Sequence, residues 1–125
     1  MPRQFNSVKE LLIAGRAFIA SHKRLGKGSF YVSVYTIQSL RASDSSYPVE
    51  LGYCAIGSLA AAEIGTDAVR IGAWKPSPIL RQAWAALDKY AEQEQPGFNI
   101  VALNDRYETT KEDILRVYDA AIAAL

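Results

Sequence analysis

The segment CAIGSLAAAEIG, residues 54–65, decides the fold of this 125-residue chain. Its side chains are mostly small, and the pattern predicts a helix from about Tyr53 to Ile64 that Gly65 ends. Gly57 and Ala61 lie four residues apart and therefore share one face of this helix. Gly57 weakens the helix by about 1 kcal/mol relative to alanine. Close packing of neighbouring helices would offset that loss, so we expect this slim helix at the centre of the fold.

Two amphipathic helices flank this segment along the chain. The first begins after Ser7, which forms a capping-box pair with Glu10. The second has Ser77 as its N-cap and Pro78 at its first position, where proline is favoured. Apolar side chains recur at helical spacing in both helices. These are Val8, Leu11, Leu12, Phe18, Ile19, Leu80, Ala83, Trp84, Leu87, Tyr90 and Ala91.

Two other segments predict extended structure. Residues 29–40 are rich in β-branched and aromatic side chains and predict a strand, which a loop over 42–48 follows. The apolar run 98–103 predicts a short buried extended segment that can pair with this strand. Asn104 and Asp105 then predict a turn.

A last amphipathic helix follows, with two alternative N-terminal caps. These are Thr109 with Glu112, and Thr110 with Asp113.

Together these patterns predict one helical domain that spans residues 1–125. Its class is mainly α, with about four amphipathic helices around the central Ala/Gly-rich helix and one or two short β-strands; an α+β arrangement stays open. A chain of this length buries roughly two-thirds of the surface that its unfolded form exposes. The fold therefore needs neither a disulfide nor a metal ion to form its core.

The chain contains one cysteine, Cys54, and one histidine, His22. One cysteine cannot form an internal disulfide, and this pair cannot supply a thiolate zinc cluster or a His-rich metal site. We therefore expect no cofactor. A lone free thiol fits a reducing, cytoplasmic compartment. No apolar run approaches the ~20 residues of a membrane span, so we expect no membrane insertion.

The charges of the chain are unevenly placed. Residues 1–30 carry six Lys or Arg against one Glu, whereas residues 88–125 carry eight Asp or Glu against four Lys or Arg. We favour the interpretation that the two ends attract each other within the fold or are solvated. The alternative is a basic surface for phosphate, nucleic acid or an acidic partner, formed by Lys23, Arg24 and Lys27.

Cys54 is the candidate nucleophile because it lies at the predicted start of the central helix. The positive end of a helix dipole favours the thiolate there. A nucleophilic cysteine also needs a base, which only His22 can supply, and Asp105 or Asn104 would orient that base. We favour the alternative that Cys54 fills the core, because free cysteine is commonly buried and small residues surround it in sequence.

Three segments resemble an uncharacterised family, a domain of unknown function found in small actinobacterial and phage proteins. The first is the opening helix with its glycine-rich turn, residues 8–30. The second is the run Cys-Ala-Ile-Gly-Ser-Leu at 54–59, similar to the family's Cys-Ala-x-Gly-Ala helix. The third is 101–105, similar to the family's Trp-Asn-Asp turn, with leucine in place of the tryptophan. The resemblance implies a helical intracellular domain whose second helix and Asn104–Asp105 turn touch, and it implies no activity.

The sequence contains many folding signals and no complete catalytic set. We therefore expect a non-enzymatic accessory domain that binds a protein partner or a second copy of itself. Aromatic residues in or near the predicted loops suit such a surface, or alternatively are buried under those loops. These are Tyr47, Tyr53 and Trp74. Asn104 and Asp105 are candidate binding residues because they belong to a polar trio, completed by Arg106, directly after the apolar run 98–103, which would form a polar site beside the central helix. The alternative function is a small hydrolase or acyl transferase that uses Cys54, His22 and Asp105.

Overall fold

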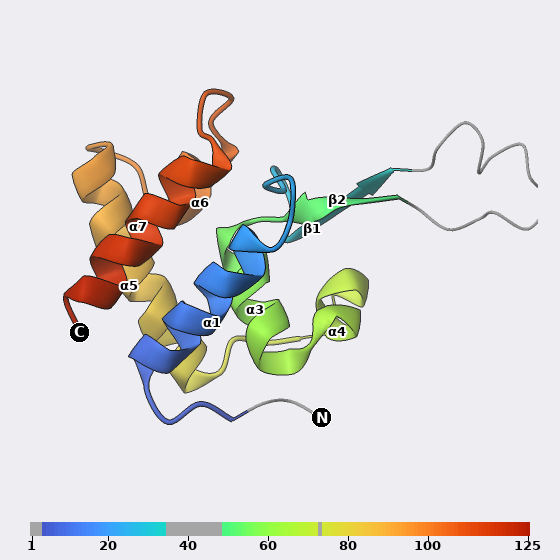
Figure 1. The fold of residues 1–125 in the computed structure, drawn as a ribbon, viewed down its shortest axis with the longest axis horizontal. Coiled ribbons are helices and arrows are strands. Elements are labelled where there is room, and N and C mark those ends of the chain that lie inside the picture. The colour runs from blue at the N-terminus through green and yellow to red at the C-terminus, as the bar shows by residue number, and fades with distance from the viewer. Residues whose placement is uncertain (1–3, 35–48, 73) are drawn as a thin grey trace, which may run out of the picture.

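The structure is a computed structural model that describes residues 4–34, 49–72 and 74–125. Within these ranges it contains six helices and two strands (Figure 1). In chain order they are α1 (Val8–Ala20), β1 (Tyr31–Val34), β2 (Val49–Tyr53), α3 (Ala55–Ile64), α4 (Thr66–Ile71), α5 (Pro78–Glu94), α6 (Ile100–Asp105) and α7 (Lys111–Ala123). The predicted class, mainly α with one or two short strands, is confirmed. No helix in these ranges has both the length and the apolar character needed to cross a membrane.

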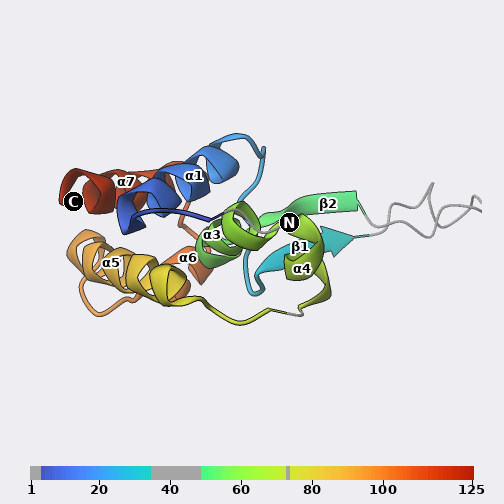
Figure 2. The same cartoon turned by 90° about the horizontal axis from the view of Figure 1, so that it is seen from below.

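Helix α3 lies at the centre of the fold, as its small residues predicted. Helix α1 packs against α3, α5 and α7, and α5 packs against α7. In Figure 2, α1 and α7 lie on one side of the molecule, α5 and α6 lie on the other, and α3 sits between them. Eight of the ten residues of α3 are buried. The same core contains buried large apolar side chains of the other helices: Leu11, Leu12, Leu80, Leu87, Ile100, Ile114, Val117 and Tyr118.

The small residues of this core are required by the close approach of neighbouring backbones. A Cβ atom added to Gly57 would lie 2.0 Å from the carbonyl oxygen of Phe30, a backbone atom that cannot easily move. On α1, a Cβ added to Gly15 would lie 2.8 Å from the Leu59 side chain and 3.1 Å from the Tyr118 hydroxyl. Packing of this density offsets the weak helix propensity of glycine.

Helix α3 begins later than predicted because Tyr53 belongs to a strand. Strands β1 and β2 are antiparallel, with Tyr31 opposite Tyr53 and Val32 opposite Gly52. Cys54 therefore occupies the N-cap position between β2 and α3. Its backbone N–H donates to the carbonyl of Phe30 at 3.2 Å. This direct strand-to-helix junction places the thiol and the residues before β1 next to each other.

The prediction of an extended segment at 98–103 was wrong, because most of it forms α6. Asn99 is the N-cap, and its side-chain oxygen accepts the N–H of Ala102 at 2.8 Å. Ile100 and Leu103 are both buried and lie three residues apart, which is helical spacing. Short apolar runs do not distinguish a buried strand from a short buried helix. The partner of β1 is consequently β2, and Asn104 and Asp105 end a helix instead of forming a turn.

Part of the predicted strand and loop lies outside the described residues. The strand predicted over 29–40 is confirmed at Tyr31–Val34, and its remainder after residue 34 is not among the described residues. The predicted loop over 42–48, which includes Tyr47, is not among them either.

The helix caps follow the local sequence closely. Ser7 and Ser77 cap α1 and α5 as predicted. Of the two alternatives for the last helix, Thr110 and Asp113 form the capping box. The two oppositely charged ends of the chain also meet, because Arg16 on α1 donates two hydrogen bonds to the Asp119 carboxylate on α7.

A substitution at Gly57 tests whether α3 is as tightly enclosed as the structure indicates. Gly57→Ala should destabilise the protein by at least about 2 kcal/mol, although alanine is the better helix former, because the new methyl group meets backbone atoms. Urea unfolding followed by circular dichroism measures the change.

Ser58→Ala is the matched control in the same helix. The Ser58 hydroxyl is buried and has no hydrogen-bond partner among the described residues, so its removal should leave stability unchanged or slightly increased. Equal changes in stability for Gly57→Ala and Ser58→Ala would contradict the packing described for Gly57.

Candidate binding site

A pocket of about 200 Å³ lies in front of the N-terminus of α3. Its walls come from the segment before β1, from the first turn of α3 and from α6. Most of the lining side chains are apolar. The others carry a thiol, a hydroxyl, an amide and a carboxylate. The lining residues are Gly28, Ser29, Phe30, Cys54, Ala55, Ile56, Ile100, Val101, Asn104 and Asp105.

Asn104 ties together the three segments that form this pocket. Its side chain is almost fully buried, at 1% exposure. Its Oδ1 accepts the backbone N–H of Ala55 at 2.9 Å, and its Nδ2 donates to the carbonyl of Gly26 at 2.8 Å. The same nitrogen donates to Asp105 Oδ1 at 3.1 Å. The contact expected between the central helix and the Asn104–Asp105 segment is therefore confirmed.

Asp105 holds the glycine-rich segment against the end of α6. Its Oδ1 accepts the N–H of Gly28 at 2.9 Å, in addition to the bond from Asn104. Gly28 has a φ of +79°, a conformation that glycine adopts with little strain. Asp105 Oδ2 has no hydrogen-bond partner among the described residues, and Asp105 lines the pocket. Oδ1 thus holds two segments of the fold together, and Oδ2 can accept a hydrogen bond from a ligand in the pocket.

Lys27 caps the C-terminal end of α6, although it lies far from that helix in the sequence. Its Nζ donates to the carbonyls of Asn104 and Thr109, both at 2.8 Å, and to the carbonyl of Arg106. Burial lowers the pKa of Lys27, and the nearby carboxylates, of which Asp105 is the first, oppose that shift. Lys27 is therefore engaged inside the fold, whereas Lys23 and Arg24 lie exposed.

The Cys54 thiol faces two opposing influences at the start of α3. Its Sγ accepts the backbone N–H of Gly57 at 3.2 Å, which favours the thiolate. The side chain is only 8% exposed, however, and burial raises the pKa of the Cys54 thiol above its ordinary value. The Tyr118 hydroxyl donates to the carbonyl of Ala55 at 2.6 Å, and burial raises the Tyr118 pKa well above normal, with Cys54 adding to the shift. Both groups are therefore protonated near neutral pH.

His22 lies away from the lining of this pocket, just beyond the end of α1. Its Nδ1 is 2.8 Å from the carbonyl oxygen of Phe18, and its ring packs against Phe18 and Tyr53 with centroids at 4.5 and 5.3 Å. Its backbone carbonyl accepts the Lys111 ammonium at 2.9 Å. The structure thus brings Cys54 and Asp105 to one pocket and does not add His22 to its lining.

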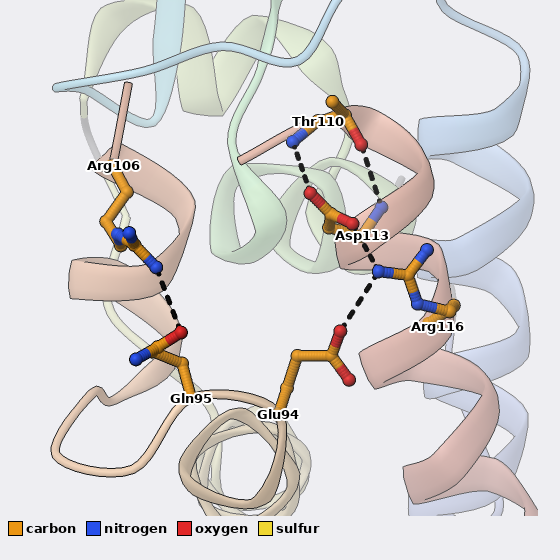
Figure 3. Close-up of polar contacts among 6 residues, drawn as sticks. All are labelled: Glu94, Gln95, Arg106, Thr110, Asp113 and Arg116. Atoms are coloured by element: carbon orange, nitrogen blue, oxygen red, sulfur yellow. Dashed lines mark hydrogen bonds and ion pairs between the residues drawn. The ribbon is translucent and has the colours of Figure 1, made fainter. Parts of the chain in front are cut away.

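A second, polar pocket lies between the end of α5 and the start of α7 (Figure 3). Arg116 joins Glu94 on α5, at 3.0 Å, to Asp113 on α7. Arg106 donates to the side-chain oxygen of Gln95 at 3.1 Å. These side chains bond to one another between the helix ends, and exposed ion pairs of this kind contribute little to stability. We interpret this network as a brace between helix ends.

Sequence reasoning found the polar half of the first pocket and missed its apolar half. The sequence pattern marks Cys54, Asn104 and Asp105, whereas it marks neither Phe30 nor Val101 as a site residue. No local signal could have found these two side chains, because Phe30 precedes β1 and Val101 lies in α6, and only the packing of both segments around the start of α3 brings them to one pocket. Within the described ranges, no three His, Cys, Asp or Glu side chains are placed to hold a metal ion.

These features define a mainly helical domain with an apolar pocket at the start of its central helix. The chain belongs to a family of unknown function, DUF6197, whose family model matches residues 5–124. This agrees with the resemblance to an uncharacterised family. No match was found among curated proteins or among solved structures.

Removal of the Asn104 amide tests its role as the link between segments. Asn104→Ala should destabilise the protein by about 3 kcal/mol, because it leaves the buried Ala55 N–H and the Gly26 carbonyl without partners. Asn99→Ala removes a helix cap at the start of the same helix and should cost only about 1 kcal/mol. Chemical unfolding measures both, and equal losses would contradict the linking role of Asn104.

The pH dependence of thiol alkylation tests the state of Cys54. Because burial raises its pKa, alkylation by iodoacetamide should be slow near neutral pH and should keep rising beyond about pH 9. The same thiol in urea-unfolded protein should react at the ordinary rate. His22→Ala should leave the profile unchanged, since His22 is not part of the pocket lining. A rate that is already maximal near pH 7 and falls in His22→Ala would instead support the hydrolase alternative.

Proposed function

We propose that this domain acts without catalysis by binding a protein partner, one apolar side chain of which enters the pocket at the start of α3. The observation that carries the proposal is the exposure of the pocket walls. Phe30 and Val101 are large hydrophobic side chains, yet they are 39% and 40% exposed. Both line the pocket, so an occupant would cover apolar surface that otherwise faces water.

The volume of the pocket supports a side chain as its occupant. Pockets for drug-sized ligands span roughly 300–1,000 Å³, whereas an apolar cavity of about 150 Å³ is enough for benzene. At about 200 Å³, this pocket fits one aromatic ring or one branched aliphatic group. Buried anchors of this kind supply much of the affinity of protein interfaces.

The surroundings of the pocket resemble an interface in composition. The Phe30 ring packs edge-on against Trp74 and Trp84, with centroids at 5.0 and 6.5 Å. Aromatic residues are enriched at the centres of protein interfaces. Asp105 Oδ2 at the rim can accept a backbone N–H of the bound segment. An apolar centre with a polar rim is the common arrangement of such sites.

The alternative function, a Cys54-dependent hydrolase or acyl transferase, has less support. Its favourable feature is that Cys54 and Asp105 line the same pocket. The raised pKa of the thiol and the position of His22 both argue against an activated nucleophile. Nucleic-acid binding is also less supported, because Lys27 donates to backbone carbonyls and leaves Lys23 and Arg24 as the exposed cations of the predicted basic surface.

The proposal extends to a cytoplasmic accessory role in an actinobacterial cell or its phage. The single cysteine supports the compartment, and the resemblance at 54–59 and 101–105 supports the source. The partner is an unidentified protein or a second copy of this chain.

Selection from a random peptide display library tests the proposal even though the partner is unidentified. Peptides that bind the wild-type chain should share one large apolar residue. Val101→Glu should weaken their binding by at least about tenfold, because it places a charge in an apolar wall. Binding is measured by fluorescence anisotropy of labelled peptides.

Tyr107→Glu is the matched control, since it adds the same charge at a side chain that is 95% exposed and outside the pocket lining. Its peptide affinity should equal that of the wild type. Failure to select any peptide, or equal binding to Val101→Glu, would overturn the proposal. Sedimentation over a range of concentrations identifies the case in which the partner is a second copy.

A further inference from the structure

Glu63 is a buried acidic side chain at the opposite end of α3 from the pocket described above. It lies in the last turn of that helix and is only 8% exposed. The Ser77 hydroxyl lies 2.8 Å from each of its carboxylate oxygens. Among the described residues, no Lys, Arg or His forms an ion pair with it. A buried carboxylate in this position therefore lacks a positive partner within the described part of the chain.

The neighbours of Glu63 satisfy only part of its hydrogen-bonding capacity. A hydroxyl has one proton to donate, whereas a carboxylate offers about four acceptor sites. Ser77 is also the N-cap of α5, and its oxygen accepts the Leu80 N–H at 3.1 Å. The start of α5 favours a negative charge, but the C-terminal end of α3 disfavours it. Acceptor sites of the carboxylate therefore stay open, and a cationic donor beside Glu63 can fill them and form an ion pair with it.

An open pocket of about 330 Å³ gives access to this carboxylate. Its lining residues are Gln4, Phe5, Asn6, Glu63, Ile64, Ser77 and Ile79. Glu63 is the only charged residue among these seven. Phe5, Ile64 and Ile79 provide apolar walls, and the amides of Gln4 and Asn6 provide polar ones. This combination matches a ligand with a positive end and an apolar stem.

We propose that this pocket, the Glu63 pocket, binds an alkyl chain that ends in an ammonium or guanidinium group, with the positive charge placed against Glu63. The apolar stem lies along Phe5, Ile64 and Ile79. A small aliphatic amine and the Lys or Arg side chain of a partner protein share this chemistry. The inference rests on residues other than those of the proposed protein-binding pocket, so either one can fail without the other.

Titration of the full-length chain with n-butylammonium chloride, followed by ¹⁵N–¹H NMR, tests the inference. Saturable shifts are expected at the backbone amides of Phe5, Ile64 and Ile79. n-Butanol, a neutral molecule of similar length, should produce no saturable shift at matched concentrations. Sodium chloride at equal ionic strength controls for screening. The absence of saturable shifts with the amine, or equal binding of butanol, would overturn the inference.

Two substitutions locate the bound charge. Glu63→Gln keeps the shape of the side chain and should weaken amine binding by about tenfold or more. Gln4→Lys adds a cation at an exposed position of the lining and should weaken it as well, while Glu63 and Ser77 stay intact. Gln82→Lys on α5, outside the lining, is the matched charge control and should bind as the wild type does. Unchanged affinity in folded Glu63→Gln or in Gln4→Lys would overturn the inference.

A second pair of probes distinguishes the two sources of the cation. Nα-acetyl-lysine methylamide carries the ammonium on a peptide-like unit, and its Nε-acetylated form lacks the charge. Tighter binding of the charged form than of n-butylammonium supports a partner's side chain, and equal binding supports a free amine. Equal binding of the charged and acetylated forms would contradict the role of Glu63.

Discussion

The buried side-chain amide of Asn104 holds the start of α3 to the neighbouring segments of the fold through its hydrogen bonds. Asn104 satisfies the Ala55 N–H and the Gly26 carbonyl at the same time, although these groups belong to segments far apart in the chain. Neither group has access to water, so each would be left without a partner if the amide were absent. Lys27 strengthens the same junction from the other side, because its ammonium binds the carbonyls at the end of α6. The pocket walls are therefore positioned by polar contacts, even though the pocket itself is largely apolar.

The tight packing of α3 and the openness of the neighbouring pocket have the same origin. Gly57 allows the backbone of Phe30 to approach the first turn of the helix, where the Phe30 carbonyl also accepts the Cys54 N–H. With its backbone fixed there, the Phe30 ring lies at the rim of the pocket and packs against Trp74 and Trp84. A larger residue at position 57 would displace this segment. The glycine is thus needed for the fold, and the exposed ring follows from it.

Features set by neighbouring residues could be predicted from the sequence, and features set by distant packing could not. The caps at Ser7, Ser77 and Thr110 were predictable because the groups that bond lie within three residues of each other. The central place of α3 followed from its small side chains. The helical state of residues 98–103 was not predictable, because a six-residue apolar run looks alike in a buried strand and a buried helix. The inward position of Lys27 was missed, since its three carbonyl partners lie 77 to 82 residues away.

The opposing effects on the Cys54 thiol explain why binding is better supported than nucleophilic chemistry. A cysteine at a helix start is reactive when the dipole stabilises a solvent-accessible thiolate. Here the enclosure that makes α3 central also removes water from the sulfur, and the loss of solvation outweighs the bond from Gly57. A base close to the thiol would be needed to reverse this balance, but His22 packs against Phe18 and Tyr53. The same burial leaves the apolar neighbours of the thiol, Phe30 and Val101, as the part of this site that a partner can contact.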